Sequence, residues 1–278
     1  MALPDRMNAM LLTGHGGPEM LVHRDDVPVP RPAEGEVLIE VSACGINNTD
    51  IKVREAAYAV DFDPNSGKQE SEAAASISSV SGETTLSFPR IQGADIVGHV
   101  VAVGAGVPES RVGERVLVDF SIYHGRDADG RPTMDLANVD YIGHGRDGGF
   151  ADYVAVPSAN AHAIKRDIPD AALATFGCST LTGEHMLARV DVKVGQYVLV
   201  TGAGGGVGSA AVQLVRARGA LPVVVTSRDK VGTLEGLGAE VCVARQDFAG
   251  PNGAFDGERF VEAVAEAVGG RNRIDAVV

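Results

Sequence analysis

Cysteine is scarce in this sequence of 278 residues, which has three cysteines and no tryptophan. Cys44, Cys178 and Cys242 are far apart and odd in number. A disulfide framework is therefore not expected, and a reducing, cytoplasmic location fits this composition better than a secretory one. Three cysteines also exclude a structural zinc site with four cysteine ligands.

Basic residues are also few: the sequence has 24 Lys and Arg residues but 37 Asp and Glu residues, which gives a formal net charge of −13. Nucleic acids and anionic membranes are bound by basic surfaces, so neither partner is expected. No apolar run reaches the roughly 18 residues of a membrane span, and the first residues lack the segments of a secretory signal. Apolar side chains (45%) and glycine (35 residues) are plentiful, which favours a globular α/β protein.

The first 160 residues predict a β-rich domain. Short apolar or alternating runs between Gly and Pro turns are typical of strands, and they occupy 7–12, 36–42, 96–103, 115–118 and 149–157. Pro28, Pro30 and Pro32 indicate an extended connector. Residues 59–88, rich in Ser, Ala and acidic residues, predict an inserted surface loop that is either a lid or a solvated insertion without a role. Residues 121–148 predict a second loop.

From residue 161 onward helices and strands alternate. Apolar strands are expected at 197–201, 221–226, 240–243 and 274–278, and helices at 169–176, 181–189 and from about 207, 230 and 257. Gly238 and Gly269 stand where glycines end helices. The βαβαβαβ order predicts a doubly wound parallel sheet, the Rossmann arrangement.

A glycine-rich turn joins the first of these strands to its helix. The run after Thr201 is Gly202-Ala203-Gly204-Gly205-Gly206-Val207-Gly208. Gly202 permits the tight turn, Gly205 lets the backbone approach a pyrophosphate, and Gly208 lets the helix pack on the strand. The helix start, at Gly206 and Val207, offers N–H groups and a positive dipole end to phosphates. The turn predicts a dinucleotide site, with a purely structural turn as the alternative.

The end of the second strand indicates which dinucleotide is bound. NAD sites usually place Asp or Glu there to bind the ribose 2′-hydroxyl. This sequence has Ser227, Arg228 and Lys230, whose hydroxyl and two cations suit the 2′-phosphate of NADPH. Asp229, an acidic residue one or two positions later than usual, is the one residue of this segment that favours NAD instead. The alternative is that Arg228 and Lys230 are solvated charges at the start of a helix.

Over essentially its whole length the chain resembles the medium-chain dehydrogenase/reductase superfamily. The resemblance rests on GHGGPEMLVHRDDVPVPRPAEGEVLIEVSACGIN, GGFADYVAVP, the Thr182-Gly183 segment and VLVTGAGGGVGSAAVQLVRARGA, in that order. It implies a GroES-like catalytic domain at 1–160, followed by a Rossmann NADP-binding domain at 161–278. It also implies that Thr182 belongs to the cofactor site and that the protein is a homodimer.

Alcohol dehydrogenases of this superfamily bind a catalytic zinc through Cys, then His, then Cys or Asp. In this chain Asn47 stands at the first ligand position, Ala94 replaces the His, and only Cys178 matches. One Cys cannot hold zinc, so no catalytic metal is expected. An improvised site that uses His99 and Cys44 is the alternative.

The first motif instead resembles the zinc-independent quinone oxidoreductase branch. Its Gly-(Val/Ile)-Asn-x-x-Asp-x-x-x-Arg-x-x-x-Tyr pattern is matched at Asn47, Asp50, Arg54 and Tyr58. The resemblance implies hydride transfer from NADPH to a quinone or α,β-unsaturated carbonyl, with hydrogen bonds that stabilise the developing anion. Asn47 and Tyr58 are candidate donors, Asp50 is expected to orient its neighbours, and Arg54 to pair with Asp50. Local turn-holding by Asn47 and Asp50 is the alternative.

The sequence ends in an apolar strand, which is the fourth of the six strands of a doubly wound dinucleotide domain. We therefore expect a fragment of a longer protein, truncated after its fourth strand, with that strand as an exposed edge and with little activity of its own. Two other functions stay open at this point. They are an alcohol dehydrogenase with an atypical zinc site, and a nucleotide-binding protein without turnover.

Overall fold

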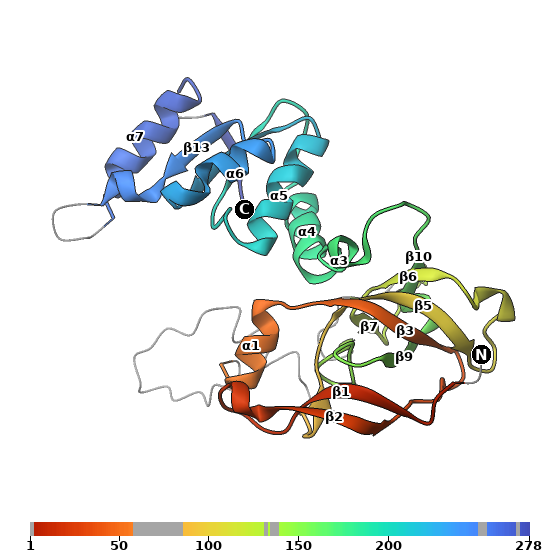
Figure 1. Cartoon of the computed structure of the whole chain (residues 1–278). Coiled ribbons are helices and arrows are strands. Elements are labelled where there is room, and N and C mark those ends of the chain that lie inside the picture. The colour runs from red at the N-terminus through yellow and green to blue at the C-terminus, as the bar shows by residue number, and fades with distance from the viewer. Residues whose placement is uncertain (1–2, 58–85, 131–132, 134–138, 250–254, 271–272) are drawn as a thin grey trace. The chain divides into compact units, whose positions relative to one another are not determined.

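The computed structural model describes residues 3–57, 86–130, 133, 139–249, 255–270 and 273–278. The chain forms two compact units, Met1–Gly177 and Cys178–Val278 (Figure 1). The division lies later than the boundary expected at residue 160, because helix α3 (Asp170–Leu173) packs on the first unit. Leu173 and Ala174 are buried against Val97, and Arg115 forms an ion pair with Asp170.

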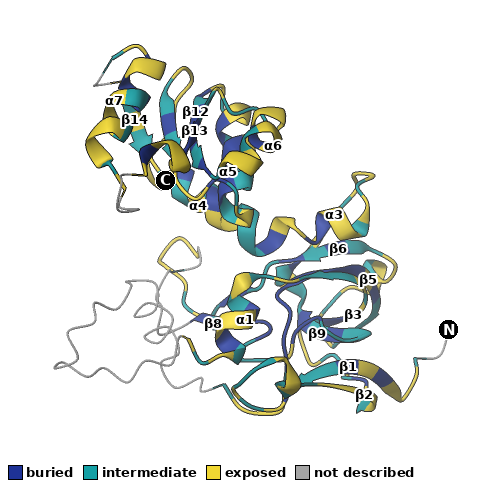
Figure 2. Ribbon diagram, turned by 60° about the vertical axis from the view of Figure 1, so that its left-hand side comes forward, coloured by how far each residue is buried: buried dark blue, intermediate teal, exposed yellow. Residues whose placement is uncertain are grey.

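A five-stranded antiparallel sheet forms the core of the first unit. Its order is β10 (Ala161–Ala163), β6 (Arg115–Val118), β5 (Asp95–Val103), β3 (Glu36–Gly45) and β9 (Tyr153–Pro157). Val37, Ile39, Ile96 and Val100 are fully or almost fully buried in this core. Figure 2 shows the buried residues as dark blue along these strands. The predicted β-rich domain is therefore confirmed.

A second sheet of the first unit has the order β2 (Leu21–Pro28), β1 (Arg6–Leu12) and β4 (Arg90–Ile91). The sequence suggested only a connector around Pro28, whereas Pro28 ends β2 at the edge of this sheet. An edge strand tolerates proline because one of its sides needs no ladder hydrogen bonds. A further pair, β7 (Ser121–Tyr123) and β8 (Val139–Tyr141), lies within the segment predicted as a loop.

The second unit contains a four-stranded parallel sheet. Its order is β13 (Val241–Ala244), β12 (Leu221–Thr226), β11 (Tyr197–Val200) and β14 (Ile274–Val277). Numbered along the chain, this order is 3-2-1-4, as in a doubly wound dinucleotide domain. The predicted Rossmann arrangement is confirmed.

Helices cover both faces of this sheet. Helices α4 (Leu181–Arg189), α5 (Gly206–Ala217) and α6 (Val231–Gly236) bury Leu187, Val212 and Leu234 in one apolar cluster, whereas α7 (Gly257–Ala267) packs Val264 against the other face. Gly238 and Gly269, at φ of 100° and 79°, follow α6 and α7 as predicted. None of the described helices combines the length and apolar character needed to cross a membrane.

Candidate functional site

The glycine-rich turn leads from β11 into α5. Gly202 has a left-handed backbone, with φ of 60°, and the extended residue Gly205 caps the helix that starts at Gly206. A Cβ on Gly208 would lie 2.5 Å from Cα of Ala203 and 2.6 Å from the carbonyl oxygen of Gly202. Only glycine allows this approach of helix to turn, and Val207 lies in the first turn of the same helix.

Lys230 reaches from the end of β12 back to this turn. Its Nζ donates a hydrogen bond to the carbonyl oxygen of Gly204 at 2.8 Å. A Cβ on Gly204 would lie 3.0 Å from Oγ1 of Thr226, the last residue of β12. The glycine turn and the end of the second strand, which the sequence assigned to phosphate and to 2′-phosphate, are thus adjacent in the structure.

Ser227 and Arg228 each meet a carboxylate. The side chain of Ser227 forms a hydrogen bond with Asp229, which is the main cause that holds the pKa of Asp229 below its ordinary value. The Arg228 guanidinium forms an ion pair with Asp247, and its backbone N–H donates to Oε1 of Gln246 at 3.1 Å. Sequence reasoning missed Asp247, although the pairing of neighbouring parallel strands signals that the residues after β12 and β13 meet.

Thr182, predicted in the cofactor site, lies in the first turn of α4. Its hydroxyl donates to the carbonyl oxygen of Cys178 at 2.7 Å, within the helical segment itself. Ser179, one turn earlier, faces the start of α5, since a Cβ on Gly206 would lie 2.6 Å from its Oγ. Like Asp247, Ser179 lies near the predicted cofactor site and was not identified from the sequence.

Asn47 lies at the N-terminus of helix α1 (Asn48–Arg54) and connects it to β5. Asn47 and Asp50 form a capping box, in which the Asn47 backbone N–H donates to Oδ2 of Asp50 at 2.8 Å. The Asn47 side-chain Nδ2 donates to Oδ2 of Asp95 at 3.0 Å. Asp95 is only 1% exposed. The local turn-holding role is thus present, and the same amide also reaches a buried carboxylate from a distant part of the chain.

Burial governs the electrostatics around Asn47. It raises the pKa of the Asp50 carboxyl, and the charge of Asp95 adds to this effect, while the hydrogen bond from Asn47 opposes it. Burial likewise raises the pKa of the Cys44 thiol far above its usual range, with Asp50 and Asp95 contributing. Cys44 is therefore an unreactive, protonated packing residue.

Arg54 is on the same helix but does not pair with Asp50 as expected. Its Nη2 pairs with Glu55 at 3.0 Å, and its Nε donates to the carbonyl oxygen of Gly16 at 3.3 Å. The contact with Gly16 fixes the end of α1 to the loop after β1. Tyr58, and the part of the predicted loop up to residue 85, lie outside the described residues.

The residues at the metal positions of zinc-dependent relatives do not fit zinc. Ala94 is buried and has no donor atom, and the Asn47 amide is hydrogen-bonded to Asp95. His99, the alternative ligand, lies exposed on β5. Among the described residues no three His, Cys, Asp or Glu side chains are grouped to hold a metal ion.

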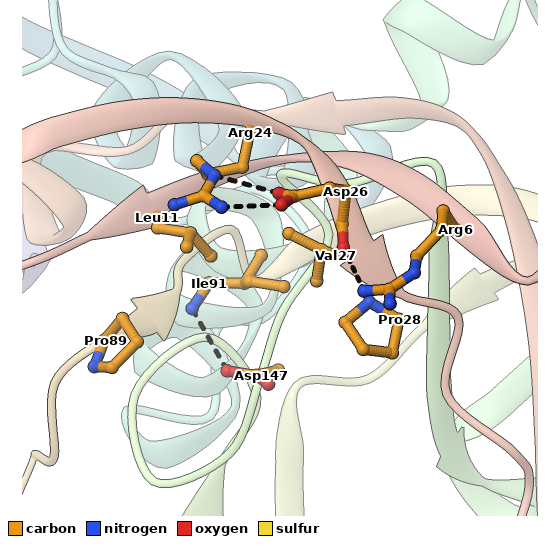
Figure 3. Close-up of a pocket in the computed structure, with 9 residues that line it drawn as sticks. All are labelled: Arg6, Leu11, Arg24, Asp26, Val27, Pro28, Pro89, Ile91 and Asp147. Atoms are coloured by element: carbon orange, nitrogen blue, oxygen red, sulfur yellow. Dashed lines mark hydrogen bonds and ion pairs between the residues drawn. The ribbon is translucent and has the colours of Figure 1, made fainter.

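A separate surface groove of about 390 Å³ lies over β1, β2 and β4 (Figure 3). It is lined by Arg6, Leu11, Arg24, Asp26, Val27, Pro28, Pro89, Ile91 and Asp147. Its charged groups have partners: Arg24 pairs with Asp26, Arg6 donates to the Asp26 carbonyl oxygen, and Asp147 accepts from the Ile91 N–H and pairs with Arg90. It contains none of the predicted site residues.

Residues 33–166 match the family described as the alcohol dehydrogenase GroES-like domain. A solved structure from Sinorhizobium meliloti 1021, provisionally named an alcohol dehydrogenase, is 52% identical with a TM-score of 0.82, over 99% of this chain and 69% of that one. An NAD-dependent alcohol dehydrogenase of Sulfolobus acidocaldarius is 29% identical over 95% of this chain and 71% of its own length. The human quinone oxidoreductase is 29% identical over 83% of this chain and 54% of its own length.

The chain spans 61% to 63% of the length of three further curated relatives, all named alcohol dehydrogenases. The two-unit fold, the glycine turn and these similarities agree with one another. The similarities run through both units rather than through one of them. The chain belongs to the medium-chain dehydrogenase/reductase superfamily.

Proposed function

We propose that this chain is part of an oxidoreductase that transfers a hydride from NADPH to a quinone or an α,β-unsaturated carbonyl without catalytic zinc. The observation that carries the proposal is the hydrogen bond between Asn47 and Asp95, 3.0 Å long, at the position where zinc-dependent relatives begin their metal site. An amide there, and Ala94 at the second position, leave too few donors for zinc. Reduction of an electron-poor double bond requires only that the developing anion is stabilised, which hydrogen bonds can do.

The glycine turn supports a nicotinamide dinucleotide as the hydride source. Backbone N–H groups at Gly206 and Val207 would hold the pyrophosphate, and Arg228 and Lys230 would hold the 2′-phosphate. The bound cofactor supplies the hydride, and the protein supplies position and charge.

The residues around α1 take different parts in this reaction. Asn47 donates a hydrogen bond to the oxygen on which negative charge develops, and Asp50 fixes the Asn47 backbone. Arg54 anchors the helix, and Tyr58 supplies the proton. Hydride addition to the β-carbon of an enone and protonation of the α-carbon give the saturated carbonyl and NADP⁺, so that atoms and charge balance.

A zinc-dependent alcohol dehydrogenase is the second candidate. Cys178 stands at one of the ligand positions, and several relatives are named alcohol dehydrogenases. This reading requires two further ligands from residues that do not occupy the expected positions.

The experiment uses the full-length protein. Its metal content is measured, and the oxidation of NADPH and of NADH is followed with a panel of quinones and enones. Turnover by zinc-free protein, with NADPH preferred, is the expected result. Stoichiometric zinc that Cys178→Ser removes, together with oxidation of alcohols, would support the second candidate. Cofactor binding without turnover of any panel member would instead indicate a nucleotide-binding protein that is not an enzyme.

A further inference from the structure

The parallel pairing of β12 and β13 brings a third cation to the predicted 2′-phosphate site. Thr226 at the end of β12 lies opposite Ala244 at the end of β13. The next residue is Ser227 on one strand and Arg245 on the other. Ser227 precedes the short 3₁₀ turn η6 (Arg228–Lys230), and Arg245 is the first residue of the 3₁₀ turn η7 (Arg245–Phe248). The cations predicted from the sequence to bind the 2′-phosphate, Arg228 and Lys230, both lie in the first of these turns.

The three cations differ in what already balances their charge. Arg228 forms an ion pair with Asp247, and Lys230 donates to the carbonyl oxygen of Gly204. The exposed side chain of Arg245 makes no hydrogen bond or ion pair with any residue that the structure describes. Its positive charge still acts on Asp229: after the hydrogen bond from Ser227, the charges of Lys230 and Arg245 also lower the pKa of that carboxyl. The pairing of Thr226 with Ala244 places Arg245 beside the end of β12.

A 2′-phosphate carries close to two negative charges at neutral pH and offers three acceptor oxygens. A cation that is already neutralised by a carboxylate contributes less to binding it than one that is not. Arg is also the side chain that binds phosphate in bidentate fashion. For binding the 2′-phosphate, Arg245 is therefore favoured over Arg228, whose charge is already balanced by Asp247.

We propose that Arg245 is a specificity-determining residue that binds the 2′-phosphate of NADPH beside Ser227, and contributes more to this binding than Arg228. The inference rests on the NADPH preference put forward above. It adds a residue from the neighbouring strand to a site that the sequence confined to residues 227–230.

The test measures how the full-length protein binds 2′,5′-ADP and 5′-AMP, which differ by the 2′-phosphate alone, with isothermal titration calorimetry. We expect Arg245→Gln to weaken the binding of 2′,5′-ADP at least about tenfold and to leave 5′-AMP unchanged. Arg245→Lys, which keeps the charge, should retain part of the affinity, and Arg228→Gln should lose less than Arg245→Gln. Arg216→Gln, in an exposed pair with Glu240, is the matched control and should change neither ligand.

Two results would overturn the proposal, and they have different meanings. If the unmodified protein prefers 2′,5′-ADP and Arg245→Gln keeps that preference, the role of Arg245 is wrong while the NADPH preference stands. If the unmodified protein binds both nucleotides equally well, the NADPH preference fails and the role of Arg245 fails with it. Circular dichroism of each variant checks that the exposed substitutions leave the fold intact.

Discussion

Replacing Gly208 by alanine tests how closely α5 must pack on the turn after β11. The added Cβ would lie 2.5 Å from Cα of Ala203, 2.6 Å from the carbonyl oxygen of Gly202 and 2.9 Å from the backbone nitrogen of Ala203. All three atoms belong to the backbone, so rotation of a side chain cannot relieve the overlap. The helix or the turn must move instead.

The expected cost follows from two opposing effects. Overpacking a tight site costs about 1–3 kcal/mol, and three backbone contacts favour the upper end of that range. Alanine is favoured over glycine inside a helix by about 1 kcal/mol, which offsets part of the cost. The second unit should therefore lose about 2 kcal/mol of opening free energy, which corresponds to about 30-fold faster hydrogen exchange in its most protected amides.

Gly232→Ala is the matched control, because Gly232 lies within helix α6 and a Cβ there would meet no atom within 4 Å. This substitution should stabilise the second unit by about 0.4–1 kcal/mol. Hydrogen exchange measured by mass spectrometry on peptides that cover β11 and α5 reports the effect of Gly208→Ala, and peptides that cover α6 report the control. Equal or slower exchange in Gly208→Ala than in the unmodified protein would refute the packing argument.

Three other substitutions have expected outcomes. Gly205→Ala should cost at most about 1 kcal/mol of stability, since alanine is a weaker N-cap than glycine but its Cβ would meet only the Gly202 oxygen at 3.5 Å. It should weaken dinucleotide binding, because the methyl group would face a bound pyrophosphate; unchanged binding in calorimetry would remove Gly205 from the site. Asp247→Asn should free Arg228 and tighten binding of 2′,5′-ADP by about 1.5- to 5-fold, the range for an exposed ion pair, and weaker binding would show that Asp247 positions Arg228 instead. The Asp50→Asn variant should gain stability relative to the unmodified protein as the pH rises above 3.8. Burial raises the pKa of Asp50 in the folded state, so the unmodified protein loses folding free energy when this carboxyl is deprotonated, whereas Asn does not titrate. Urea denaturation from about pH 4 to about pH 8 measures the difference, and a difference that does not change with pH would contradict the argument.

Elements with strong local patterns were predictable from the sequence. Helix α5 begins at Gly206, one residue before the expected start, and β12 occupies the expected residues 221–226. The capping box at Asn47 also has a local signature, because Asn and an acidic residue three positions later satisfy each other's backbone groups. Such features depend on residues within one or two helical turns of each other.

Contacts between distant residues were not predictable in the same way. The Asn47–Asp95 hydrogen bond joins residues 48 positions apart, and the Arg228–Asp247 pair joins residues 19 apart. Both depend on strand register, which the hydrophobic pattern does not specify to the residue when a strand is buried on both faces. Strand β2 was missed because its residues are mostly exposed and show no clear alternation.

The hydrogen bond between Asn47 and Asp95 also bears on the evolutionary routes open to this site. Placing zinc ligands at the family positions would require Asn47→Cys and Ala94→His together, alongside Cys178. Either substitution alone leaves two ligands at most, fewer than zinc needs. The first would also remove the amide hydrogen bond to a buried carboxylate, a loss of about 1–3 kcal/mol. A lineage that changed Asn47 first would thus lose stability before it gained a metal, so this order of single steps toward a zinc enzyme is opposed at its beginning.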